Sequence, residues 1–327
     1  MNGVGDVNLQ PLSLRKRAWG SNFLFPKKDS SGGPKRMRRN AELERIRHPR
    51  ERRVLLLSAL ANAGIVAGVI AALVLAPDWL AAHHRIQQLA ERVRTVAIVA
   101  VLILPAVTFL RRSRLALVRE NSVRLGRDQV PGIFSILERQ CSALGITDPP
   151  ELHVSKEATS QLSNAVSFVD GRQAIVLRAD IFKGLEWIED RSDAIAFVLG
   201  YELGRLRLGH ASWWQDVYLG YLIRIPVLRL PLLTVETLSR DRHAALLAPD
   251  GIRGLILQAS GGELLRYVSV GAYVRQVMEG ASRWSRLAAL ARRAPHVSSR
   301  ERALYRAGFF HLDRDLARLE QPAAIVH

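Results

Sequence analysis

A long stretch without charge sets the first limit on this chain. From Val54 to Ala76 none of the 23 residues is charged, and a helix of that length, rising 1.5 Å per residue, covers the ~30 Å hydrocarbon core of a bilayer. Pro77 and Asp78 end the stretch, and Trp79 follows where an interfacial aromatic is expected. We therefore predict a transmembrane helix over residues 54–76.

A second apolar stretch runs from Thr95 to Leu110, but it is shorter and contains Pro105. Arginines flank it at both ends, and their long side chains could extend to the two membrane surfaces. We predict a second transmembrane helix over residues 95–110, joined to the first by a short external loop over residues 77–94. The alternative is a helix buried in the soluble part of the protein.

Basic residues determine the expected orientation. The formal net charge is +17, and eight arginines lie between residues 36 and 53. Residues 1–53 are predicted to be a disordered basic arm, because residues 26–35 are rich in Pro, Gly and Ser. Next to a membrane helix, anionic lipid is the favoured partner of this arm and nucleic acid an unlikely one.

The same distribution predicts a multi-pass protein of the cytoplasmic membrane, with its N-terminus and soluble domain on the cytoplasmic side. A single cysteine, Cys141, excludes an internal disulfide and fits a reducing compartment. It is interpreted as a small apolar residue inside a helix.

After a juxtamembrane linker over residues 111–127, residues 128–310 are predicted to be a globular, mostly helical α+β domain, followed by a tail over 311–327. The expected elements are a helix over 130–144, a strand over 151–154, and a hairpin of 164–168 with 174–177 around Asp170-Gly171. A further helix includes residues 180–185. The segment 213–238 is aromatic and apolar but contains Arg224 and Arg229, so we expect it at the membrane interface, with core packing as the alternative.

The most informative helix is expected over Asp193–His210, with Asp193 as its N-cap and apolar residues at helical spacing. Its centre reads Tyr201-Glu202-Leu203-Gly204-Arg205. In the zinc-protease pattern H-E-x-x-H, two histidines one turn apart bind the metal and the Glu is the general base. Here Glu202 is present, while Tyr201 and Arg205 occupy the two histidine positions.

With histidine at those two positions, this stretch would be very close to the active-site helix of the HtpX-like and CAAX-prenyl-protease-like membrane zinc metallopeptidases, which are gluzincins. The chain resembles this family over about residues 128–310. The resemblance implies a zincin-like metalloprotease domain with a small β-hairpin or sheet, preceded by a two-helix transmembrane hairpin.

Asn164-Ala165 match the two residues that begin the family's edge strand beside the active site. An exposed edge strand can hold an extended peptide by backbone hydrogen bonds. The resemblance therefore implies a substrate-binding role for Asn164 and Ala165, and a plain hairpin with a solvent-facing edge is the alternative.

Two later segments match the family in the same order. Asp241 and Arg242 match the end of E-x-x-x-D-R, whose Glu is the third zinc ligand, and Thr237 stands at that ligand position. Further on, His296 and Arg302 match an H-P-x-x-x-E-R-like segment whose His and Arg face the cleft, although the Pro is absent. The resemblance thus implies cleft positions for Asp241, His296 and Arg302.

All three zinc-ligand positions are therefore substituted, and we expect no metal. Arg205 never coordinates a cation, and we expect its guanidinium to pair with Glu202 on the same helix face. Glu236 is next to Thr237 but about 100° around the helix, so it should point elsewhere. A rebuilt site from His210, His243 and Glu202 is geometrically possible but less favoured than hydrogen-bonded or surface histidines.

The expected function is that of a membrane-anchored pseudoprotease that binds a peptide or protein client, or an active family member, without cleaving it. The alternative is an active zinc metalloendopeptidase with a non-standard site, acting on membrane or misfolded proteins. A weaker alternative is a membrane anchor that presents its basic arm to lipid or nucleic acid.

Overall fold

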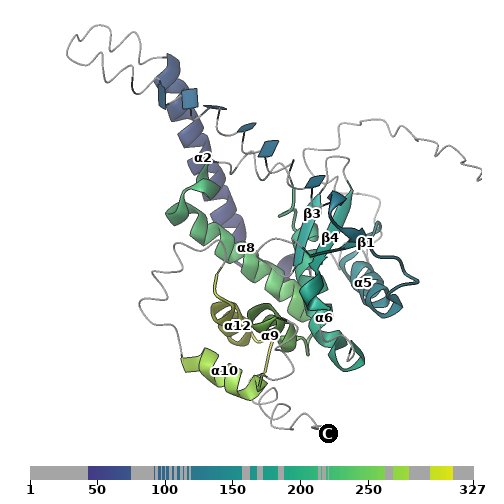
Figure 1. Ribbon diagram of the computed structural model, residues 1–327. Helices are drawn as coiled ribbons and strands as arrows, with labels where there is room; N and C mark the ends of the chain where they lie inside the picture. The colour runs from purple at the N-terminus through teal and green to yellow at the C-terminus, as the bar shows by residue number, and fades with distance from the viewer. Residues whose placement is uncertain are drawn as a thin grey trace, which may run out of the picture.

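The computed structural model describes residues 43–74, 119–156, 163–167, 172–182, 188–212, 221–261, 268–279 and 295–311, with isolated positions between 92 and 117 and at 215 and 219. Within these ranges the chain is mostly helical and carries one small mixed sheet (Figure 1). The predicted α+β, mostly helical class is confirmed.

The sheet has four strands in the order β1-β2-β4-β3. They are β1 (Val123–Arg124), β2 (Glu151–Ser155), β3 (Ser163–Ser167) and β4 (Gln173–Arg178). β2 and β4 are parallel, whereas β3 and β4 pair antiparallel as the predicted hairpin. The turn residues Asp170 and Gly171 lie outside the described residues. β3 is therefore an edge strand, and β1 comes from the segment that was predicted to be only a linker.

Six helices make up most of the described part of the domain: α5 (Pro131–Leu144), α6 (Ile188–Arg207), α8 (Pro226–Leu247), α9 (Ile252–Ser260), α10 (Val270–Glu279) and α12 (Val297–Arg306). α5 matches its prediction, with Pro131 in the first turn and Gly145 as a left-handed C-cap. α6 lies at the centre of the core, where Phe197, Leu199 and Leu203 are fully buried.

Two local predictions need correction. α6 begins at Ile188, so Asp193 lies inside the helix and is not its N-cap. Its Oδ1 instead accepts a hydrogen bond from the N–H of Ala194 at 2.8 Å. A helix was also expected to include residues 180–185. The structure shows only a short 3-10 helix there, η2 (Ala179–Ile181), among the described residues, and residues 183–187 lie outside the described part.

α2 (Glu51–Val74) is the membrane-helix candidate. Among the described residues it alone is long and apolar enough to cross a bilayer, over Glu51–Ala71. Most of the second predicted span, 95–110, and the loop before it lie outside the described residues, as does the tail after His311. In Figure 1, α2 projects from the domain and its first turns lie beside α8.

The prediction that all of residues 1–53 are disordered is wrong for residues 43–53. Leu43 is buried in the main core, and Ile46 packs against the same cluster. These two apolar side chains, one turn apart, give the segment a face that the domain covers. Residues 1–42 lie outside the described part of the chain.

Candidate functional site

The site is built on the contact between α6 and α8. A Cβ at Gly200 would lie 3.1 Å from Cα of Ala244, and one at Gly204 would lie 3.0 Å from Cβ of His243. Because position 200 meets 244 while position 204 meets 243 and Arg240, the helices run antiparallel here. The two glycines allow the backbones to approach closely, and this places the motif residues of α6 beside α8.

Glu202 holds the edge strand to α6. Its side chain is fully buried, and its carboxylate accepts hydrogen bonds of 2.7 Å from Oγ of Ser163 and from the backbone N–H of Ala165. The Ala165 N–H therefore points toward α6 and away from β4. A buried carboxylate needs such donors, and these two use both of its oxygens.

Arg205 lies between α6 and the same strand. Its Nη1 donates to Oδ1 of Asn164 and lies 3.9 Å from Oε2 of Glu202. The expected placement of Glu202 and Arg205 on one helix face is what the structure shows. The closer partner of the guanidinium, however, is Asn164. The structure thus brings Asn164, Ala165, Glu202 and Arg205 together.

Tyr201, at the first ligand position, lies under two guanidinium groups. The Cζ atoms of Arg300 and Arg240 are 4.9 and 5.9 Å from its ring centroid, within the range of cation–π attraction. Arg300 also forms a bidentate ion pair with Asp241, with distances of 2.9 and 2.6 Å. Asp241 is therefore a buried partner of an arginine from α12.

Thr237, at the third ligand position, is buried in α8, three and four residues before Arg240 and Asp241. Its neighbour Glu236, which was expected to point in a different direction from Thr237, is also buried. It accepts hydrogen bonds from Nη2 of Arg240 at 3.0 Å and from the Gln215 side chain. Burial raises the pKa of Glu236 to about 7, against the opposing charges of Arg240 and Arg205.

The matched segment near the carboxyl end contributes differently from its prediction. His296 immediately precedes α12, and Nη1 of Arg302 donates to the backbone oxygen of Val277 in α10 at 3.1 Å. Arg300, which sequence reasoning did not select, is the arginine that reaches the α6–α8 contact. The sequence did contain an indication of this role, because a buried Asp such as Asp241 is almost always paired with a cationic side chain.

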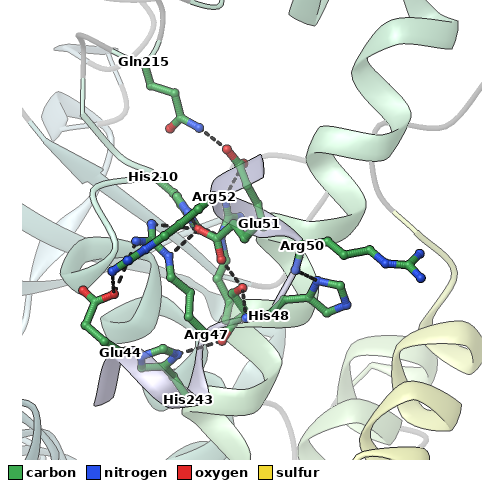
Figure 2. A network of polar contacts seen from close by, with 12 residues as sticks. Glu44, Arg47, His48, Arg50, Glu51, Arg52, His210, Gln215 and His243 are labelled. Atoms are coloured by element: carbon green, nitrogen blue, oxygen red, sulfur yellow. Dashed lines mark hydrogen bonds and ion pairs between the residues drawn. The ribbon is translucent and has the colours of Figure 1, made fainter. Parts of the chain in front are cut away.

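A second polar cluster joins the base of α2 to α8 (Figure 2). The fully buried Glu51 carboxylate accepts hydrogen bonds from Nε of Arg47 at 2.8 Å, from Nε2 of His210 at 2.9 Å and from the Ser239 hydroxyl. Ser239 also accepts from the backbone N–H of His48 at 2.9 Å. Residues far apart in sequence thus anchor α2 to the domain.

His210 connects this cluster to the first one. Nε of Arg240 donates to Nδ1 of His210 at 3.1 Å, and since guanidinium nitrogens only donate, the ring proton must be on Nε2, facing Glu51. Burial, reinforced by the charge of Arg240, lowers the pKa of His210 to about 3. The histidine is therefore a neutral bridge between Glu51 and Arg240.

The residues at the three ligand positions do not fit zinc. They offer a phenol, a guanidinium and a hydroxyl, with the cationic groups of Arg240 and Arg300 around the first, whereas zinc in proteins takes thiolate, imidazole or carboxylate ligands. Over the described ranges, no three His, Cys, Asp or Glu residues are grouped closely enough to hold a metal ion.

The alternative site from His210, His243 and Glu202 does not assemble. Both ring nitrogens of His210 have protein partners. Nδ1 of His243 lies 2.8 Å from the Ser239 carbonyl oxygen, and Glu202 is bound to β3. Each of these side chains is hydrogen-bonded inside the fold.

No family model matches this chain, and no curated protein or solved structure matches it either. The likeness to the HtpX-like metallopeptidases therefore rests on the residues and spacings named above.

Proposed function

We propose that this protein is a membrane-anchored, non-proteolytic relative of the HtpX-like zinc metallopeptidases, with a zincin-like domain that binds a peptide or protein partner. The observation that carries the proposal is the position of Arg205. Its guanidinium stands where the second metal-binding histidine is expected and bonds to Asn164 on the edge strand.

The chemistry of hydrolysis supports this reading. A zinc peptidase needs a metal-bound water of lowered pKa and a carboxylate free to take its proton. Here a permanent cation occupies a ligand position, and both oxygens of Glu202 already accept hydrogen bonds from β3. Glu202 consequently acts as a structural clamp for the strand.

The edge strand supports a binding role. β3 pairs with β4 on one side, and Glu202 takes the Ala165 N–H on its other edge. An extended segment can add to the rest of such an edge strand through backbone hydrogen bonds. Within the proposal the partner is a client polypeptide or an active family member, and the bilayer is the anchor. The proposed location is the cytoplasmic membrane, as a multi-pass protein with the domain on the cytoplasmic side.

Metal content and cleavage of an unfolded membrane-protein substrate test the proposal on the full chain in detergent. The natural protein should bind no zinc after chelator washing and should leave the substrate intact. The variant Tyr201→His/Arg205→His/Thr237→Glu restores the three ligand types and should take up about one zinc per chain, as catalytic sites do.

The opposite result is equally clear. If the natural protein holds stoichiometric zinc and cleaves the substrate, and if Glu202→Gln abolishes that cleavage, the protein is an active metallopeptidase. The Glu202→Gln variant is the matched control, because it removes the general base without changing any ligand position.

A further inference from the structure

A buried asparagine in the membrane helix contacts the chain that leads into α8. Asn62 is 4 % exposed, and its Oδ1 accepts hydrogen bonds from the backbone N–H groups of Tyr221 at 2.8 Å and Leu222 at 3.3 Å. Leu222 begins the 3-10 helix η4 (Leu222–Arg224), which continues into α8. The asparagine thus satisfies amide groups that the start of a helical segment leaves unpaired.

These amides lie well inside the predicted span. Asn62 comes eight residues after Val54, which is about 12 Å along a helix at 1.5 Å per residue. The backbone that it caps must lie at a similar depth. In water such N–H groups bond to solvent, but in hydrocarbon each one needs a partner within the protein. A polar side chain in an otherwise apolar helix meets that need.

Apolar packing holds the same segment against α2. A small buried cluster, separate from the main core, is made by leucines of this segment and of α8, and the first turns of α2 pack on it. Its members are Leu219, Leu222 and Leu232, with Val54, Leu55 and Ile223 partly buried against them. Figure 1 shows the amino-terminal half of α8 beside α2, in agreement with the contacts between α2, η4 and α8.

The same segment also exposes apolar side chains. Ile225 and Leu228 are 39 % and 44 % exposed, and α2, which contacts η4 and α8, exposes Leu56, Leu57 and Leu60. Pro226 opens α8 in the same stretch, and because proline has no N–H, it removes one of the donors that the first turn of a helix leaves without a partner. Exposed apolar side chains thus occur on both contacting segments, α2 and the start of α8.

We propose that residues 221–233 enter the leaflet next to the domain and lie beside α2, with lipid acyl chains as the partner of their exposed apolar side. The inference rests on the proposed membrane anchoring by α2. Arg224 and Arg229 limit the depth. Both have polar or electrostatic partners in the structure, and their long stems let the charged groups reach the surface.

Fluorescent probes on single cysteines test this in the full chain, reconstituted in vesicles of phosphatidylcholine and phosphatidylglycerol. The host variant is Cys141→Ala, although Cys141 is itself buried and burial raises its thiol pKa to about 11. An environment-sensitive probe is attached at Leu228→Cys or Ile225→Cys. Leu246→Cys is the matched control, because it is in the same helix and is 45 % exposed. Leu60→Cys marks the membrane helix.

Probes at 225 and 228 should be quenched several-fold more by a spin-labelled phospholipid than by aqueous iodide, and the probe at 60 should behave in the same way. The probe at 246 should instead be quenched more by iodide than by the phospholipid. Lipid quenching at 60 combined with iodide quenching at 225 and 228 overturns the inference but leaves the anchor intact. If neither quencher reaches 225 and 228, protein covers them and the inference is also wrong. If iodide quenches position 60 too, the membrane anchoring itself fails.

Discussion

At the scale of single residues, Glu51 shows how one buried carboxylate can fix the base of a long apolar helix, α2. Its oxygens accept from Arg47, His210 and Ser239, which belong to three different segments of the chain. Removal of the carboxylate would leave several buried donors without an acceptor. The cost of such a loss is larger than the net value of the contacts themselves.

We therefore expect Glu51→Ala to destabilise the protein by about 3–5 kcal/mol, the range for breaking a buried ion pair by removing one partner. The matched control is Glu44→Ala, which removes a carboxylate that pairs with the exposed Arg52 and should change stability by less than about 1 kcal/mol. Thermal unfolding of both variants in one detergent measures the difference. Equal effects would contradict the assigned role of Glu51.

His210 gives a pH dependence with a definite sign. Its pKa is about 3 in the folded protein, against 6.5 for an ordinary histidine, so the unfolded chain binds more protons between these two pH values. Stability from this group is complete above pH 6.5 and is lost as the pH falls below it.

In a series of unfolding measurements from pH 7 to 5, His210→Gln should lose less stability than the natural protein, because the glutamine can bond to Arg240 and Glu51 without binding a proton. His311→Gln, at an exposed position, should keep the natural profile. Parallel curves for the natural protein and His210→Gln would refute the assignment of a neutral, buried His210.

At the scale of elements, the clamp between α6 and β3 distinguishes a structural Glu202 from a catalytic one. In Glu202→Gln, the new amide group can accept at one atom only, so either Ser163 or the Ala165 N–H loses its acceptor. We expect a loss of about 1–3 kcal/mol and faster hydrogen exchange of the Ala165 amide. Unchanged stability and exchange would show that the carboxylate is not needed by the fold.

The close approach of α6 and α8 gives a second prediction at this scale. Gly204→Val places a branched side chain against His243 and Arg240, and overpacking of this kind costs about 1–3 kcal/mol. Gly132→Ala is the control, since a Cβ there meets nothing within 4 Å. Denaturant unfolding of the two variants should separate them, and a neutral Gly204→Val would mean that the helices can move apart freely.

At the scale of the whole molecule, the contacts of α2 connect topology to the soluble domain. Glu51 bonds to residues after α6 and in α8, so the proposed anchoring would place the amino-terminal end of α2 and the domain on one side of the membrane. The arginine distribution predicts that this side is cytoplasmic.

Cysteine labelling from outside intact cells tests this topology. In the Cys141→Ala host, the variants Arg52→Cys and Leu246→Cys should both remain unlabelled by a membrane-impermeant maleimide until the cells are opened. Labelling of both in intact cells would reverse the orientation. Labelling of only one would place the start of α2 and the domain on opposite sides, against the contacts of Glu51.

The sequence alone determined the elements that depend on local patterns. The uncharged run from residue 54 indicated α2 because hydrocarbon excludes charge, and period-two and period-3.6 patterns located the hairpin and α6. Helical spacing also identified Glu202 and Arg205 as neighbours, while the family resemblance implied that Asn164 and Ala165 lie beside them. The start of α6 and the order of residues 43–53 were predicted incorrectly, because packing against distant segments decided them.

Only the tertiary structure decided which polar groups meet across long sequence separations. Nothing periodic links Glu51 to His210, Asn62 to Tyr221, or Asp241 to Arg300. These pairs form because folding brings buried donors and acceptors together, and each must then find a partner where water is absent. For the same reason Glu236, turned away by its helical angle from Thr237, lies in the cluster with Arg240.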